Sequence, residues 1–405
     1  MPRFLLTKPI IFILGSIFGV ASMMSTTHAQ IPGLAPEEPY SFDGYIKYMG
    51  SATLPEQGDT LTDHLIHNRL NIEYRFNSNW RFNTGMRNRF IAGDSAESDL
   101  YADIIGDDPG YFNLSKNWAE GSNYVGNSTF DRLYFDWNNG DYQARAGRFR
   151  INWSMTTIWN PNDVFNSYSI YDVDYPERPG VDAIYATKKL GYASEINIAF
   201  SPNTNSELNS YSARYLFNYD GWDGQFIVGK SHLDAIIGFG FSGDIKGAAL
   251  RGEMTWFEPT QDEWITDNGD KVELESAVVS SIELSYSIAS RRNWMYTLAL
   301  LHISDPQEPQ SAIAYLNLPL TARTLSFTEF TGYADIGFDI SPLSRLTLSG
   351  SYYQDGSYFY GLSSNYSISD NWQLMLILQR FDGTGDSLFA ETANTAVYAN
   401  IGWNF

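Results

Sequence analysis

Apolar and polar residues alternate in short segments along the whole chain, and this period of two constrains the fold more than any other feature. In segment 70–76 (LNIEYRF) the apolar side chains fall on one face of an extended strand and the polar ones on the other. A turn at 77–79 follows, and 80–90 resumes the alternation, which predicts a β-hairpin. The pattern returns at 133–146, around 341–344 and at 368–378. Helical periodicity with capping residues is hard to find, so an all-β fold is expected.

The first 29 residues have the three parts of a secretory signal peptide. Two basic residues precede an apolar run at 10–20, and small and polar residues end at Ala29. The apolar run is shorter than the roughly 20 residues that a membrane-spanning helix needs. We therefore expect cleavage after Ala29, a mature chain that begins at Gln30, and a short periplasmic lead at 30–39. Such a protein is periplasmic, secreted or inserted in an outer membrane.

Short turns alternate with long segments rich in Gly, Asp, Asn, Ser and Pro. The long segments lie at about 50–62, 93–127, 153–180, 258–275, 304–323 and 381–392. Short periplasmic turns and long extracellular loops are typical of outer-membrane barrels. Residues 30–405 are thus predicted to form one transmembrane antiparallel β-barrel of about eighteen strands, with both chain ends in the periplasm. Sixteen strands is an alternative, because the strands near 233–241 and 324–340 are weakly marked.

A soluble β-helix or propeller would also alternate, but two features favour the membrane barrel. Large aromatic residues gather beside the short turns, where a membrane-interface girdle would lie. They are Phe76, Trp80, Trp137, Tyr142, Tyr219, Trp222, Trp294 and Trp372. The chain also ends with Ile401, Trp403 and Phe405 on one face of a strand. This tail resembles the C-terminal signature of Gram-negative outer-membrane proteins, which the barrel-assembly machinery reads.

Composition removes several functional classes. With 47 Asp and Glu against 26 Lys and Arg, the formal charge is -21, which would repel nucleic acid. The absence of Cys excludes disulfides and thiolate metal sites. Neither a nucleophile beside a base nor a phosphate-binding loop is found, so no catalytic residue, cofactor or metal is expected. The scattered His64, His67, His232 and His302 are interpreted as loop or barrel-rim residues.

The alternate residues of the predicted strands face the lumen, and their charges differ between the two halves of the barrel. The second to fifth strands carry Arg69, Arg75, Arg81, Arg87, Arg89, Arg132 and Arg145 on this face. The later strands carry neutral and acidic residues, among them Glu283, Asp335 and Asp339. One wall of the lumen is therefore predicted to be basic and the other neutral or acidic.

Three neighbouring stretches carry a family resemblance. Residues 147–153 (GRFRINW), 159–166 (WNPNDVFN) and 175–183 (YPERPGVDA) resemble a segment of porin-like outer-membrane proteins of Gram-negative bacteria, over about a tenth of the chain. In porins the third long loop folds into the lumen, and its acidic residues oppose basic residues of the wall. The resemblance implies this role for Asp163, Asp172, Asp174 and Glu177 against Arg81, Arg87, Arg132, Arg145 and Arg148. Ion pairs that merely hold the wall and loop in shape are an equal alternative.

The predicted function is passive diffusion of small hydrophilic solutes across the outer membrane. The expected partners are membrane lipid, lipopolysaccharide, the barrel-assembly machinery and the solutes, and a homotrimer is one candidate assembly. A non-conducting structural or adhesive barrel stays open as an alternative, and so does an outer-membrane enzyme whose residues come together only in space.

Overall fold

The structure is a computed structural model that describes residues 38–98, 100–174, 177–265, 269, 271–309, 311–317 and 320–405. The predicted signal peptide and residues 30–37 of the predicted lead lie outside the described residues. From Tyr40 onward the chain forms a closed antiparallel β-barrel of eighteen strands. The prediction of an eighteen-stranded barrel is confirmed, and the sixteen-stranded alternative is wrong because both weakly marked regions form strands.

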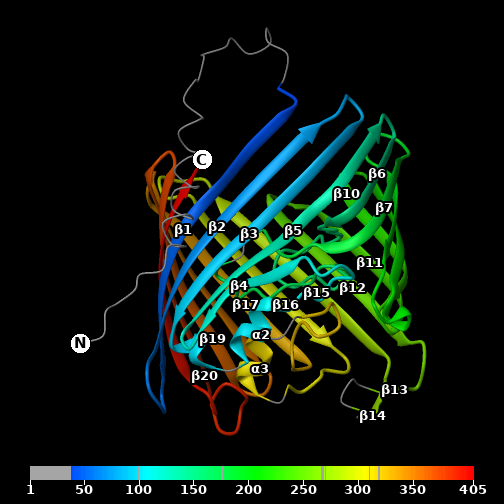
Figure 1. The fold of residues 1–405 in the computed structure, drawn as a ribbon. Helices are drawn as coiled ribbons and strands as arrows, with labels where there is room; N and C mark the ends of the chain where they lie inside the picture. The colour runs from blue at the N-terminus through cyan, green and yellow to red at the C-terminus, as the bar shows by residue number, and fades with distance from the viewer. Residues whose placement is uncertain are drawn as a thin grey trace. The chain divides into compact units, whose positions relative to one another are not determined.

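Eighteen strands form the barrel, and each of the two weakly marked regions contributes one of them. The barrel strands are β1 (Tyr40–Pro55), β2 (Leu61–Arg75), β3 (Trp80–Gly93), β5 (Tyr124–Asn139), β6 (Tyr142–Phe149), β7 (Val181–Lys189), β8 (Glu195–Ser201), β9 (Ser210–Tyr219), β10 (Trp222–Ser231), β11 (Asp234–Ile245), β12 (Ala248–Pro259), β15 (Ala277–Ile288), β16 (Trp294–Ile303), β17 (Phe330–Ser341), β18 (Ser344–Tyr353), β19 (Ser357–Ser369), β20 (Trp372–Gly383) and β21 (Asn394–Asn404). Each pairs with the next barrel strand, as Figure 1 shows for β1, β2, β3 and β5.

The first and last strands close the barrel. β1 pairs with β21 from Tyr45 opposite Asn404 to Pro55 opposite Asn394. At the seam, the Gly44 amide donates to the Phe405 carbonyl at 3.1 Å, and the Phe405 amide donates to the Gly44 carbonyl at 3.0 Å. The Phe405 ring stacks on Phe42 with centroids 5.6 Å apart. Because the barrel is closed, the sheet has no free edge. A free edge would leave backbone groups without hydrogen-bond partners, which is costly in a bilayer.

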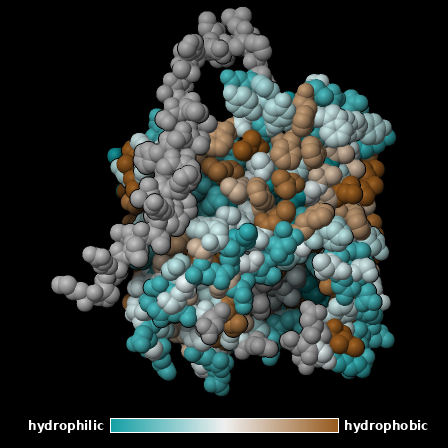
Figure 2. Space-filling model, in the orientation of Figure 1, coloured by the Kyte–Doolittle hydropathy of each residue, from teal (hydrophilic) through white to brown (hydrophobic). Residues whose placement is uncertain are grey.

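The two faces of the wall follow the alternation. On β2 the outward Ile66 is 50% exposed, whereas the inward His67 and Arg69 are 0% and 3% exposed. On β15 the outward Ile282 contrasts in the same way with the buried Glu283. Figure 2 shows apolar residues gathered in a band across the wall, with hydrophilic residues towards both ends. An apolar outside and a polar inside are the arrangement of a barrel that lies in a membrane.

Short turns and aromatic side chains define one end of the barrel. Two-residue turns with positive φ at Asp220-Gly221 and Lys246-Gly247 connect β9 to β10 and β11 to β12. Beside other short turns, Trp80 packs on Trp137 at 6.4 Å and Trp294 on Phe338 at 4.5 Å between ring centroids. These rings lie where an aromatic belt would meet the membrane interface.

The long loops at the opposite end contain further elements, several of which Figure 1 labels there. They are the short helices η1 (Asp94–Glu97), α2 (Tyr101–Gly106), η2 (Ser206–Leu208) and α3 (Ala312–Asn317), and the strands β4 (Ser115–Gly121), β13 (Glu263–Ile265) and β14 (Lys271–Glu273). β4 pairs with the part of β5 that lies beyond the end of the short β6. In the described chain, no helix has both the length and the apolar character needed to cross a membrane.

Candidate functional site

The third long loop, L3 (residues 150–180, between β6 and β7), lies inside the barrel over its described residues, 150–174 and 177–180. In chain order, L3 meets β10, β12 and β15, then β18 and β20, and finally β1 to β3 and β5. The loop therefore follows much of the inner circumference. We call residues 150–165 its first arm, and residues 171–174 with 177–178 its second arm.

Glu253 on β12 holds the backbone of the first arm. Its side chain is 4% exposed and accepts hydrogen bonds from the amides of Thr156 at 2.8 Å and Asn162 at 2.9 Å, and also from the Met155 amide. A buried carboxylate is costly unless donors surround it, and three backbone amides supply those donors. Glu253 thereby fixes the shape of the loop where the backbone has no strand partner.

Glu283 on β15 holds the adjoining residues in the same way. It is 0% exposed and accepts from the backbone amides of Thr157 at 2.7 Å and Ile158 at 3.2 Å. Arg251 donates to the Glu283 carboxylate at 2.8 Å, which balances its charge. The two glutamates together anchor four consecutive residues, 155–158, to the inner wall.

Apolar packing completes the attachment of the first arm. Trp153 and Trp159 are 1% and 4% exposed. With Val164 they join a cluster that includes the inward-facing Ile227, Ile236, Phe257, Val279, Leu301 and Ile303 of β10, β11, β12, β15 and β16. These wall positions break the polar-inside rule because L3 covers them.

The second arm begins at Tyr171, which packs against the opposite wall. Tyr171 is 9% exposed and packs edge-on against the rings of Phe359 and Phe381, at 4.7 and 5.3 Å between centroids. Its hydroxyl bonds to Tyr353 and donates to Ser351 at 3.2 Å. L3 is therefore tied to β18 to β20 as well as to β10 to β15.

Ion pairs hold the rest of the second arm. The Asp174 carboxylate lies 2.8 Å from Lys47 Nζ, 3.1 Å from His67 Nδ1 and 2.9 Å from an Arg87 nitrogen. Burial alone would raise the pKa of Asp174, but the hydrogen bond with His67 and the charges of Lys47 and Arg87 together lower it below its ordinary value. Asp172 accepts from the Asp174 amide at 2.9 Å and so shapes the turn that presents the carboxylate.

Glu177 and Asp163, the other predicted acidic residues, have different surroundings. Glu177 accepts a hydrogen bond from Tyr45 at 3.2 Å and lies 4.0 Å from Arg69. Asp163 is 1% exposed, and its nearest cation is Arg150 at 3.9 Å. Neither Asp163 carboxylate oxygen makes a hydrogen bond within the described residues. Burial raises the pKa of Asp163 to about 7.

The predicted arginines divide into those that contact L3 and those that do not. Arg87 reaches Asp174, and Arg132 donates to the backbone carbonyls of Glu177 at 2.8 Å and Arg178 at 2.9 Å. The structure places Arg81, Arg145 and Arg148 away from the four acidic residues of L3. Arg81 lies 3.9 Å from Glu73, Arg145 pairs with Asp136 at 2.8 Å, and Arg148 pairs with Asp108 and Asp182 at 2.7 Å each.

Exposure separates these arginines further. Arg148 is 3% exposed and also donates to the Phe112 carbonyl, so it joins the loop before β4 to β6 and β7. The side chains of Arg81 and Arg145 are 46% and 33% exposed, and Arg75, beside Glu73, is 35% exposed. A charge in contact with water can interact with a solute in the lumen, whereas a buried ion pair contributes to the stability of the fold.

A polar hollow of about 420 Å³ lies beside these strands. Arg69, Arg132 and Tyr134 line it together with Glu73 and Glu177. L3 thus leaves space at its second arm, and charges of both signs border that space.

Among the residues that hold L3, Lys47, His67 and Glu253 were not predicted to belong to the site, and Glu283 was predicted only to face the lumen. The interpretation of His67 as a loop or rim residue is wrong, since it lies inside β2 and is 0% exposed. A signal was available, because His67 stands two residues before Arg69 and therefore shares its face. Within the described residues, no cluster of three His, Asp or Glu side chains could hold a metal ion.

An inward third loop, a charged lumen and an apolar outer band on an eighteen-stranded barrel are together the features of a porin-like outer-membrane barrel fold. Known solved structures share this fold. Pseudomonas aeruginosa OpdK, solved with vanillate, superposes with a TM-score of 0.58 and 6% identity over 90% of this chain and 98% of that chain. P. aeruginosa OccK11 gives a TM-score of 0.56 with 8% identity over 90% and 96%. Acinetobacter baumannii OccAB2 gives 0.54 with 8% identity over 90% and 98%.

Comparison of sequences finds no relative of this chain, whereas comparison of structures finds proteins of the same fold. No protein-family model and no curated protein matches the chain. At identities of 6–8%, the likeness to the solved structures demonstrates a shared fold.

Proposed function

We propose that this protein is an outer-membrane channel through which small hydrophilic solutes diffuse passively. The observation that carries the proposal is the course of L3 along the inside of the wall, with the acidic Asp174 facing Lys47 and Arg87. A loop that only decorated the cell surface would need no matching lumen-facing partners. The polar hollow beside the second arm supports a hydrated path past the loop.

The basic wall gives this channel a preference for anions. Arg75, Arg81 and Arg145 keep about a third to a half of their side chains exposed, and their nearest carboxylates are Glu73 and Asp136. These partly exposed guanidinium groups put positive charge in contact with water on this part of the wall. A passing anion gains from that field and a cation does not.

Single-channel recording tests the proposal. The refolded mature protein is inserted into a planar bilayer under a KCl gradient, and its current steps and reversal potential are measured. We expect discrete open steps and a reversal potential of the sign that anion preference gives. Silence from barrels that are folded, as judged by heat-dependent migration on a gel, would contradict the proposal and favour a structural or enzymatic barrel.

We also propose that the chain reaches the outer membrane after cleavage behind Ala29 and is recognised there through Ile401, Trp403 and Phe405. The backbone pairing between Phe405 and Gly44 supports a role for the tail in closing the barrel. N-terminal sequencing of the membrane-inserted protein should begin at Gln30. Deletion of Phe405 should reduce the amount of inserted barrel, and undiminished insertion would contradict the second part.

A further inference from the structure

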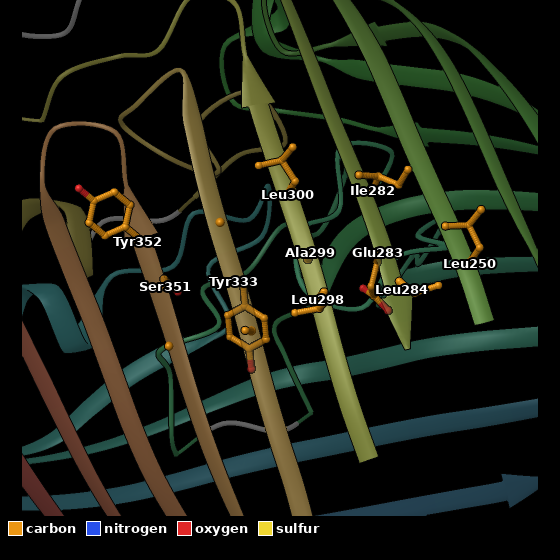
Figure 3. A pocket seen from close by; sticks show the side chains of 13 residues that line it. Leu250, Ile282, Glu283, Leu284, Leu298, Ala299, Leu300, Tyr333, Ser351 and Tyr352 are labelled. Atoms are coloured by element: carbon orange, nitrogen blue, oxygen red, sulfur yellow. The ribbon is translucent and has the colours of Figure 1, made fainter. Parts of the chain in front are cut away.

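The lipid-facing surface of the barrel is hollowed over β15 to β18. The hollow has a volume of about 760 Å³, and its sides include Leu298 and Leu300 on β16 and Tyr352 on β18. Figure 3 shows these residues on either side of β17. They are 57%, 46% and 62% exposed, which places them on the outside of the wall.

Three small residues form the low part of this surface. Gly332 stands between Leu300 and Tyr352 in register, and Ala334 stands between Leu298 and Gly350. A Cβ added at Gly332 would meet no atom within 4 Å, so its own surroundings leave room for a larger residue. The hollow is therefore open on the outer surface of the barrel. An acyl chain of a surrounding lipid can fill it and make van der Waals contacts with its sides.

An unusual basic pair lies at the turn below the hollow. Arg291 and Arg292, between β15 and β16, are the only adjacent arginines in a chain of charge -21. Both are exposed, and neither has an acidic partner in the part of the chain that the structure describes. The Arg292 guanidinium lies 5.9 Å from the centre of the Phe338 ring, which faces the lipid on β17. The pair is thus held at the membrane interface, beside the aromatic belt.

The hollow and the basic pair have the right separation for one lipid. Arg292 and Leu298 are six residues apart, which is about 20 Å along a strand and less along the membrane normal because barrel strands tilt. Half of the hydrocarbon core is about 15 Å thick. A lipid whose phosphate meets Arg291 and Arg292 would therefore place its acyl chain along the hollow.

We propose that this face is a binding site for an anionic phospholipid of the periplasmic leaflet. The acyl chain fills the hollow over Gly332, Ala334 and Gly350, and the headgroup phosphate pairs with Arg291 and Arg292. One phospholipid molecule complements both features at once, because its phosphate carries the charge that matches the arginine pair and its acyl chain matches the apolar sides of the hollow. The site depends on the barrel lying in a membrane and does not depend on whether its lumen conducts.

Native mass spectrometry of the full mature barrel in detergent tests the site. Phosphatidylglycerol and phosphatidylethanolamine with identical acyl chains are titrated separately, and the bound fraction is measured. We expect the wild-type protein to retain phosphatidylglycerol in preference. Arg291→Gln with Arg292→Gln should reduce phosphatidylglycerol binding by roughly tenfold or more and remove the preference. Gly332→Leu with Ala334→Leu should weaken the binding of both lipids.

Two matched variants control for general effects on the surface. Lys246→Gln removes a basic residue from another short turn, and Ala186→Leu enlarges an exposed residue on the outward face of β7. Both should bind as the wild type does, and heat-dependent gel migration confirms that each variant is folded. Unchanged phosphatidylglycerol binding in both paired variants overturns the proposal. A dimer in the wild type that the Gly332→Leu, Ala334→Leu variant dissociates would also overturn it, in favour of a second copy as the occupant.

Discussion

The two arms of L3 are attached to the same wall by different forces. The first arm is fixed by backbone amides that donate to Glu253 and Glu283 and by the burial of Trp153 and Trp159. Beyond Tyr171, the second arm is fixed by the Asp174 carboxylate among Lys47, His67 and Arg87. Apolar packing does not depend on the charges nearby, whereas ion pairs depend on them and weaken as salt screens them. The first arm therefore serves as a support, and the second arm presents charge to the lumen.

The largest expected effect comes from removing the support of the first arm. Glu253→Ala leaves three buried amides without an acceptor, so the free energy of unfolding should fall by about 3 kcal/mol or more. Thermal unfolding in detergent measures the loss, and single-channel recording should show larger and noisier currents as the arm detaches. Glu258→Ala, on the exposed rim of the same strand, is the control. Equal melting temperatures for the two variants would refute the anchoring role of Glu253.

Neutralising the second arm should cost less stability and change the charge of the lumen more. Asp174→Asn removes the negative partner of Lys47 and Arg87 and keeps the size of the side chain. We expect a loss of about 1–3 kcal/mol and a reversal potential shifted towards anions. Asp107→Asn, an exposed acidic residue in another loop, should change neither quantity. A shift of equal size in that control would mean that overall charge, and not the second arm, sets selectivity.

The arginines of the wall allow the same division between charge and support to be tested. Arg87→Ala with Arg145→Ala should shift ion selectivity towards cations, because these side chains border the lumen. Arg148→Ala should leave selectivity nearly unchanged and lower stability by about 3–5 kcal/mol, because it breaks a sealed network with Asp108 and Asp182. If the first pair lowers the melting temperature without moving the reversal potential, those arginines act as structural partners only.

The smallest expected effect is a difference in pH dependence between two acidic residues of the loop. The pKa of Asp163 is raised to about 7, so the folded state holds a proton that the unfolded state releases near pH 4. Its contribution therefore makes stability fall as pH rises from about 4 to about 7. The pKa of Asp174 is lowered, so its contribution is present above pH 4 and is lost as pH falls below it.

Melting temperatures measured from pH 4 to pH 8 compare the two residues. Asp163→Asn should lessen the decline with rising pH and be at least as stable as the wild type at pH 8. Asp174→Asn should retain that decline. A parallel pH profile for the wild type and Asp163→Asn would show that Asp163 carries no proton in this range.

Alternation was sufficient to locate the strands and their faces. If the register of a strand shifted by one residue, every apolar side chain of that strand would move to the lumen. The alternation therefore determines the register of each strand as well as its presence. It placed Arg81, Arg87 and Arg145 on the inner face because that assignment depends only on the parity of their positions. The same rule applied to His67 identifies it as a lumen residue, and only its interpretation as a rim residue failed.

The ion-pair partners of these residues could not be predicted from the sequence, because contacts across a lumen join residues that are far apart in the chain. Asp174 meets Lys47 across more than a hundred residues, and Arg148 meets Asp108 rather than an acidic residue of L3. Ile236 and Leu301 face the lumen although they are apolar. The sequence does not explain this exception to a polar interior, but the structure does, because the first arm packs over both residues.

The sequence by itself indicated an outward-apolar barrel of about eighteen strands and predicted a basic wall, since the strands and the faces of their side chains follow from local periodicity. The tertiary structure alone decided which charges are sealed and which remain in water. Which charges are buried depends on where L3 packs. L3 packs where strands that are distant in the sequence together supply hydrogen-bond acceptors, apolar surface and opposite charge.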